Sequence, residues 1–92
     1  MTPEAAIERD IVQYLSLRGF LVLRTHGPRN RPVEEGIPDL VCVPPMGGKM
    51  LWVEVKAKGG RVSPAQADMH ACLTERGQRV IVARSVADVE CV

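Results

Sequence analysis

The chain has 92 residues, of which 46% are hydrophobic and 25% charged, and its formal net charge is +1. This length predicts a single domain spanning residues 1–92, and the composition excludes an intrinsically disordered chain. The apolar stretches are much shorter than the roughly 20 residues that a membrane-spanning helix needs, so no membrane association is expected.

The N-terminus and the cysteines predict a cytoplasmic protein. The first ten residues include several charges and lack the apolar core of a secretory signal peptide. Cys42, Cys72 and Cys91 are odd in number and lack the paired spacing of zinc ligands. We interpret them as free thiols in a reducing compartment.

The first half of the chain predicts one helix followed by two strands. Residues 4–18 carry apolar side chains at helical spacing, with Thr2 as a candidate N-cap. Residues 20–25 and 39–43 are short apolar runs typical of strands. Between them, residues 26–37 are rich in glycine, proline and charge, and a loop is expected there.

The second half predicts a strand, a helix and a further strand. Residues 50–56 are expected to form a hairpin with the preceding strand. Ser63 and Gln66 have the spacing of a capping box that opens a helix reaching about Arg76. Residues 79–84 predict the last strand, and residues 86–90 a final helical turn. The order αβββαβ predicts an α/β fold, with a mixed four-stranded sheet flanked by helices.

Pro38-Asp39 and Glu54-Val55-Lys56 are the most informative segments. A tight hairpin brings the start of one strand close to the end of the next, so Asp39 and Glu54 are expected side by side. Two carboxylates at one sheet edge are suited to Mg²⁺, and the Val55 carbonyl is a candidate third ligand.

Lys56 shares the face of Glu54, because side chains alternate along a strand. An ammonium group beside a metal can position or help deprotonate an attacking water, or stabilise charge on a phosphate. The alternative is that Glu54 and Lys56 form an ordinary ion pair on a solvated face.

Two further segments make the pattern specific to a family. Gly36-Ile37-Pro38-Asp39-Leu40 followed by Trp52-Val53-Glu54-Val55-Lys56 resembles the PD-(D/E)XK nuclease superfamily. Ser63-Pro64-Ala65-Gln66 opening the second helix, with Glu4-x-x-Ile7 in the first, narrows the resemblance to stand-alone VRR-NUC domains of phages and bacteria. The resemblance covers roughly residues 4–84 and implies a restriction-endonuclease-like fold. It also implies a bacterial cytoplasm or a phage-infected host cell as the location.

The resemblance implies a role for each site residue. Asp39 and Glu54 would bind the metal, Lys56 would be the catalytic lysine, and Gln66 would lie at the edge of the active site. For Gln66 the alternative is a capping role alone, and both can be true. A glutamate of the first helix would complete the site, and Glu4 and Glu8 both remain candidates, with a slight preference for Glu8.

The implied activity is that of a Mg²⁺-dependent endodeoxyribonuclease, with Mn²⁺ as a substitute and no organic cofactor. Similarity to Holliday-junction resolvases implies a homodimer acting on four-way DNA junctions. A monomeric nuclease for flaps or duplexes and a non-cleaving DNA-binding module remain alternatives. Candidate phosphate contacts are Arg24, His26, Arg29, Arg31, Lys49, Lys58 and Arg61.

Overall fold

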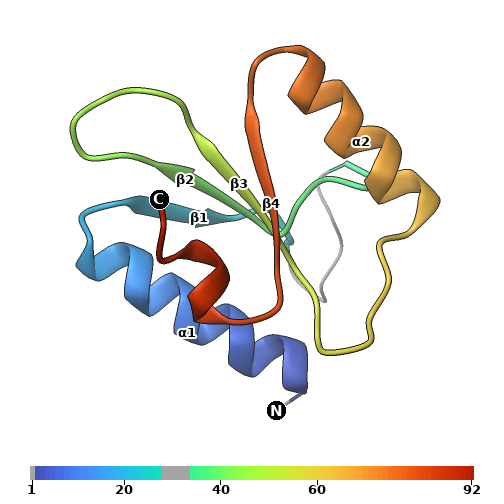
Figure 1. Ribbon diagram of the computed structural model, residues 1–92, viewed down its shortest axis with the longest axis horizontal. Coiled ribbons are helices and arrows are strands. Elements are labelled where there is room, and N and C mark those ends of the chain that lie inside the picture. The colour runs from blue at the N-terminus through green and yellow to red at the C-terminus, as the bar shows by residue number, and fades with distance from the viewer. Residues whose placement is uncertain (1, 28–33) are drawn as a thin grey trace.

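The computed structural model describes residues 2–27 and 34–92, which form an α/β fold (Figure 1). The elements in chain order are α1 (Pro3–Leu17), β1 (Leu21–Arg24), β2 (Leu40–Val43), β3 (Leu51–Val55), α2 (Pro64–Glu75), β4 (Arg79–Ala83) and the 3₁₀ turn η2 (Val86–Val89). The predicted αβββαβ order is confirmed.

The four strands form one mixed sheet in the order β1-β2-β3-β4. β1 and β2 pair antiparallel, as do β2 and β3. β3 and β4 pair parallel, with α2 in the connection between them. Parallel strands need such a crossover, whereas the short turn between β2 and β3 suffices for an antiparallel hairpin.

Both helices begin where the sequence predicts. The Ala5 N–H donates to Thr2 Oγ1 at 3.1 Å, which caps α1. Ser63 and Gln66 form the reciprocal capping box that opens α2. Each side chain satisfies a backbone N–H that the first helical turn would otherwise leave without a partner.

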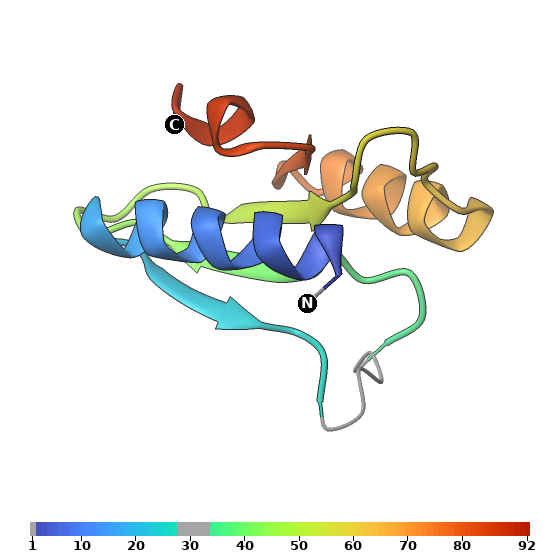
Figure 2. The ribbon, with the colours of Figure 1, turned by 90° about the horizontal axis from the view of Figure 1, so that it is seen from below.

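The hydrophobic core lies between α1 and one face of the sheet (Figure 2). Ile11 and Leu15 of α1 are fully buried there, and η2 adds Val89. The buried apolar side chains of the sheet are Leu40, Cys42, Leu51, Val53, Val55 and Ala83. Strand alternation places Leu51, Val53 and Val55 together on this core face.

The opposite face of the sheet is covered unevenly. α2 packs mainly on β4 and has no buried residue. Trp52 is half-buried, and its Nε1–H donates to Gln78 Oε1 at 3.1 Å. Over β1, Leu21 and Leu23 remain 59% and 46% exposed.

None of the helices in the described residues is long and apolar enough to span a membrane.

Candidate active site

Asp39 lies immediately before β2, where the chain passes the end of β3. The antiparallel register pairs Leu40 with Val53, which brings Asp39 beside the last residues of β3. The Val55 N–H donates to Asp39 Oδ2 at 2.7 Å, and His26 Nδ1 lies 3.3 Å from Asp39 Oδ1. Both carboxylate oxygens therefore have a fixed partner.

Glu54 lies on the face of β3 that is opposite to the hydrophobic core, and it is only 1% exposed. Two side chains of α2 hold it. Gln66 Nε2 donates to Glu54 Oε2 at 3.3 Å, and His70 Nε2 lies 3.2 Å from Glu54 Oε1. Within the described residues, no buried side-chain polar atom lacks a hydrogen-bond partner, so these contacts satisfy the buried carboxyl group.

The pKa of Glu54 is raised to about 8, mainly because the carboxyl group is buried. The hydrogen bond and the negative charge of Asp39 also raise this pKa, whereas the positive charge of Lys56 lowers it. The negative charge of Glu4 also raises the pKa of Glu54, with the smallest effect of these groups. Such a shift means that the ionised form of Glu54 lacks sufficient positive charge around it. A divalent cation between Asp39 and Glu54 would supply that charge.

Lys56 lies two residues after Glu54, so alternation along the strand direction places both side chains on the same side, and Lys56 is partly buried. Its charge influences the pKa of both Glu54 and His70. In residues 2–27 and 34–92, its ammonium group forms no hydrogen bond or ion pair. Lys56 is thus close enough to affect Glu54, and no described residue competes with a substrate for its amino group.

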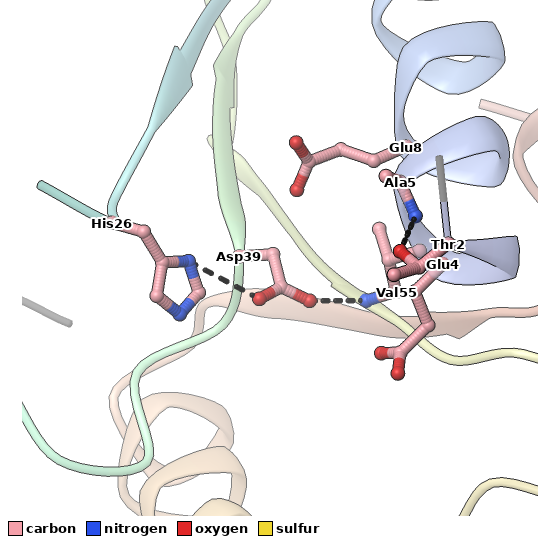
Figure 3. A pocket seen from close by; sticks show the side chains of 7 residues that line it. All are labelled: Thr2, Glu4, Ala5, Glu8, His26, Asp39 and Val55. Atoms are coloured by element: carbon pink, nitrogen blue, oxygen red, sulfur yellow. Dashed lines mark hydrogen bonds and ion pairs between the residues drawn. The ribbon is translucent and has the colours of Figure 1, made fainter. Parts of the chain in front are cut away.

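A pocket of about 270 Å³ opens between the N-terminus of α1 and Asp39 (Figure 3). Its lining residues are Thr2, Glu4, Ala5, Glu8, His26, Asp39 and Val55. In Figure 3 the carboxylates of Glu4 and Glu8 leave α1 in different directions. The structure therefore brings both glutamates to the site.

The two glutamates differ in their partners. Arg24 Nε donates to Glu8 Oε2 at 3.0 Å, which ties β1 to α1 and offsets the charge of Glu8. Glu4 has no such partner among the described residues and adds its negative charge to the field at Glu54. This difference favours Glu4 over Glu8 as the helix residue that acts on a cation.

The donor set fits a small hard cation. Mg²⁺ is usually held by one or two protein carboxylates together with water and substrate phosphate oxygens. Asp39 and Glu54 supply two carboxylates from adjacent strands. In the described residues, no group of three or more His, Cys, Asp or Glu side chains is arranged to hold a metal ion, so a cation held by Asp39 and Glu54 would depend on water and substrate oxygens for its other ligands. For Val55, the structure shows the N–H engaged with Asp39, and its carbonyl remains a predicted ligand.

The model of the VRR-NUC domain family matches residues 3–87 of this sequence. The chain belongs to the VRR-NUC family. Its αβββαβ domain is thus a nuclease domain, as the motif predicted.

Two similar proteins agree with this membership. The chain is 36% identical over 80 residues to "Putative nuclease p44" of Acyrthosiphon pisum secondary endosymbiont phage 1, covering 86% of this chain and 80% of the relative. A solved structure described as a VRR_NUC domain superposes with a TM-score of 0.83 at 26% identity. That match covers 99% of this chain and 94% of the solved chain.

The basic residues predicted to contact DNA are scattered over the VRR-NUC domain. Lys58 and Arg61 are exposed in the segment that follows β3, at the same end of the sheet as Asp39. Lys49 is exposed in the turn that joins β2 to β3, which is the opposite end of the hairpin. The length of β3 separates it from the site, so we remove Lys49 from the candidate contacts. Arg29 and Arg31 lie outside the described residues.

Sequence reasoning missed His70 altogether and described His26 only as a possible phosphate contact. The chain has two histidines, and each contacts one of the two candidate metal carboxylates. The available signal for His70 was its spacing, because residues 66 and 70 lie on one helix face.

Proposed function

We propose that this VRR-NUC domain is a Mg²⁺-dependent, structure-specific endodeoxyribonuclease in which Mn²⁺ can substitute for Mg²⁺. The observation that carries the proposal is the convergence of Asp39, Glu54 and Lys56 at one end of the β2–β3 hairpin. Asp39 precedes β2 and Glu54 lies in the adjacent strand β3, and the charge of Lys56 acts on the pKa of Glu54. Within residues 2–27 and 34–92, the Lys56 amino group has no ion-pair partner.

The proposed residues have separate tasks in phosphodiester hydrolysis. Asp39 and Glu54 would hold the cation, and Glu4 would add negative charge at its edge. Lys56 would position the attacking water and stabilise the charge that develops on the phosphate. When bound, a divalent cation makes water more acidic and offsets phosphate charge.

We further propose that the substrate is a four-way DNA junction and that the nuclease acts as a homodimer. A two-fold dimer presents two equivalent active sites, which suits a substrate with two symmetric scissile strands. The exposed Leu21 and Leu23 on β1 support the dimer, because a second subunit could cover these large apolar side chains and remove them from water. The phage relative supports action in the bacterial cytoplasm or a phage-infected cell.

Cleavage of labelled four-way, flap and linear duplex DNA, with Mg²⁺ or with a chelator, tests the proposal. We expect wild-type protein to cut the four-way junction in Mg²⁺, and Lys56→Ala to lose at least about 100-fold in rate. Lys49→Ala, at the far end of the hairpin, is the matched control and should cut normally. Full activity of Lys56→Ala would refute the site.

Two other results would correct the finer parts of the proposal. Preferential cutting of flaps or duplexes by a species with the solution mass of a monomer would replace the junction and the dimer. Junction binding without cleavage in either Mg²⁺ or Mn²⁺ would instead identify a non-cleaving DNA-binding module.

A further inference from the structure

We propose that His70 is a positioning residue that, together with Gln66, sets the orientation of the Glu54 carboxylate for metal binding. This inference rests on the proposed role of Glu54 as a metal ligand. It concerns a residue that neither the motif nor the pocket at α1 includes.

His70 and Gln66 hold different oxygens of the same carboxylate. His70 Nε2 lies 3.2 Å from Oε1, and Gln66 Nε2 lies 3.3 Å from Oε2. One contact alone would allow the carboxylate to rotate about its terminal bond. Two contacts, made from successive turns of α2, fix the plane of the carboxylate.

Gln66 is itself held at both ends of its amide. Its Oε1 accepts the Ser63 N–H at 2.9 Å, while its Nε2 reaches Glu54. The capping box of α2 is therefore joined directly to the buried carboxylate. The sequence left open whether Gln66 caps the helix, lies at the edge of the active site or does both. The structure shows that it caps α2 and also contacts Glu54.

The burial of the pair makes the geometry restrictive. The side chain of Glu54 is 1% exposed and that of His70 is 14% exposed, so water has little access to replace either contact. Each carboxylate oxygen can accept two hydrogen bonds or ligands. When α2 occupies one acceptor position on each oxygen, the remaining positions are left for the neighbouring Asp39 carboxyl group and for the proposed cation.

A purely structural role for His70 predicts a different result. In that case, loss of His70 would lower the stability of the protein without changing the metal affinity of the molecules that remain folded. In a positioning role, the affinity for metal falls. Residues that orient a metal ligand by hydrogen bonding typically change affinity by about 10–100-fold when replaced.

Calorimetric titration of the full chain with Mn²⁺, in the absence of DNA, separates the two roles. We expect His70→Leu to raise the Kd for Mn²⁺ at least about tenfold. His70→Gln, which keeps a donor on the side chain, should recover most of the affinity. Cys72→Ala, an exposed replacement on α2, is the matched control and should bind like wild type. Unchanged affinity in His70→Leu would overturn the proposal.

A second measurement needs no variant and covers the case in which His70→Leu fails to fold. Long-range ¹H–¹⁵N spectra of wild-type protein report which imidazole nitrogen carries hydrogen. In Mg²⁺-loaded protein we expect a proton on His70 Nε2, since a carboxylate that ligates a metal can only accept. A ring protonated solely on Nδ1 would overturn the proposal.

Failure of the underlying function gives a different pattern. If wild-type protein shows no heat of Mn²⁺ binding, or if Glu54→Gln binds Mn²⁺ as tightly as wild type, then Glu54 is not a ligand and the proposed metal site is wrong. If Glu54→Gln abolishes binding but His70→Leu does not affect it, only the positioning role of His70 is wrong.

Discussion

The backbone N–H of Val55 donates a 2.7 Å hydrogen bond to the Asp39 carboxylate. This bond joins the end of β3 to the start of β2 through a side chain rather than through the sheet ladder. It fixes one oxygen of Asp39 and places the carboxylate beside Glu54, the neighbour of Val55 in the chain. Asp39, the proposed metal ligand, is thus also part of the structure that aligns the hairpin.

The double role of Asp39 predicts different outcomes for two replacements. Asp39→Asn keeps an oxygen for the Val55 N–H but loses the negative charge, so we expect a normal fold and loss of cleavage. Asp39→Ala loses both and leaves a partly buried N–H without a partner, which should cost about 1–3 kcal/mol of unfolding free energy. Chemical denaturation and junction cleavage measure the two effects. Equal stability of both variants would contradict this assignment.

Gly36 is expected to be intolerant of any side chain. Its φ is +80°, and a Cβ atom there would collide with the Ala65 carbonyl oxygen at the start of α2. Gly36→Ala should therefore destabilise the protein by more than about 1 kcal/mol and displace the segment that leads to Asp39. Gly59→Ala is the matched control, because Gly59 has φ +81° with open space around it. Thermal unfolding should show the larger loss for Gly36→Ala, and equal losses would argue against the contact.

Glu4 and Glu8 can be distinguished by metal affinity. Arg24 already offsets the charge of Glu8, whereas Glu4 acts on the field at Glu54. We expect Glu4→Gln to weaken Mn²⁺ binding several-fold, and Glu8→Gln to weaken it less. Titration calorimetry of both variants gives the comparison. The reverse order would restore the preference for Glu8 that the sequence suggested.

The raised pKa of Glu54 predicts a pH-dependent stability in metal-free protein. The unfolded chain releases the Glu54 proton near pH 4.5, whereas the folded protein keeps it until about pH 8. The free energy of unfolding should therefore fall as pH rises through this window, by at most about 1.4 kcal/mol per pH unit. Glu54→Gln removes this contribution, so its stability relative to wild type should increase from pH 5 to pH 8.

Denaturation in the presence of a chelator measures that difference. The lowered pKa of His70 acts in the opposite direction below about pH 6.5, because the unfolded chain then binds the extra proton. Comparison of Glu54→Gln with wild type, at each pH, isolates the contribution of Glu54. A constant difference between the two proteins would show that the carboxyl group titrates normally in the fold.

The three cysteines should differ in reactivity. Burial raises the pKa of Cys42 to about 11, whereas Cys72 and Cys91 are exposed. Because the thiolate is the reactive form, a thiol reagent at pH 8 should modify Cys72 and Cys91 rapidly and Cys42 only after unfolding. Mass spectrometry of the modified peptides gives the result. Rapid labelling of Cys42 in native protein would show that the core beneath α1 opens readily.

The sequence by itself determined the elements and the central motif. Strong local signals set these features: helical periodicity over Pro3–Leu17, the capping box at Ser63, and alternation along Leu51–Val55. The hairpin spacing also predicted that Asp39 lies beside Glu54. Such features depend on residues close in the chain, which is why a single sequence was sufficient to predict them.

Only the tertiary structure decided what surrounds the motif. The ion pair of Arg24 with Glu8, the contact of His26 with Asp39 and the contact of His70 with Glu54 depend on how α1 and α2 pack against the sheet. No local pattern encodes that packing, because it follows from burial of apolar surface over the whole domain. The same packing made Glu54 a buried carboxyl group rather than an exposed one.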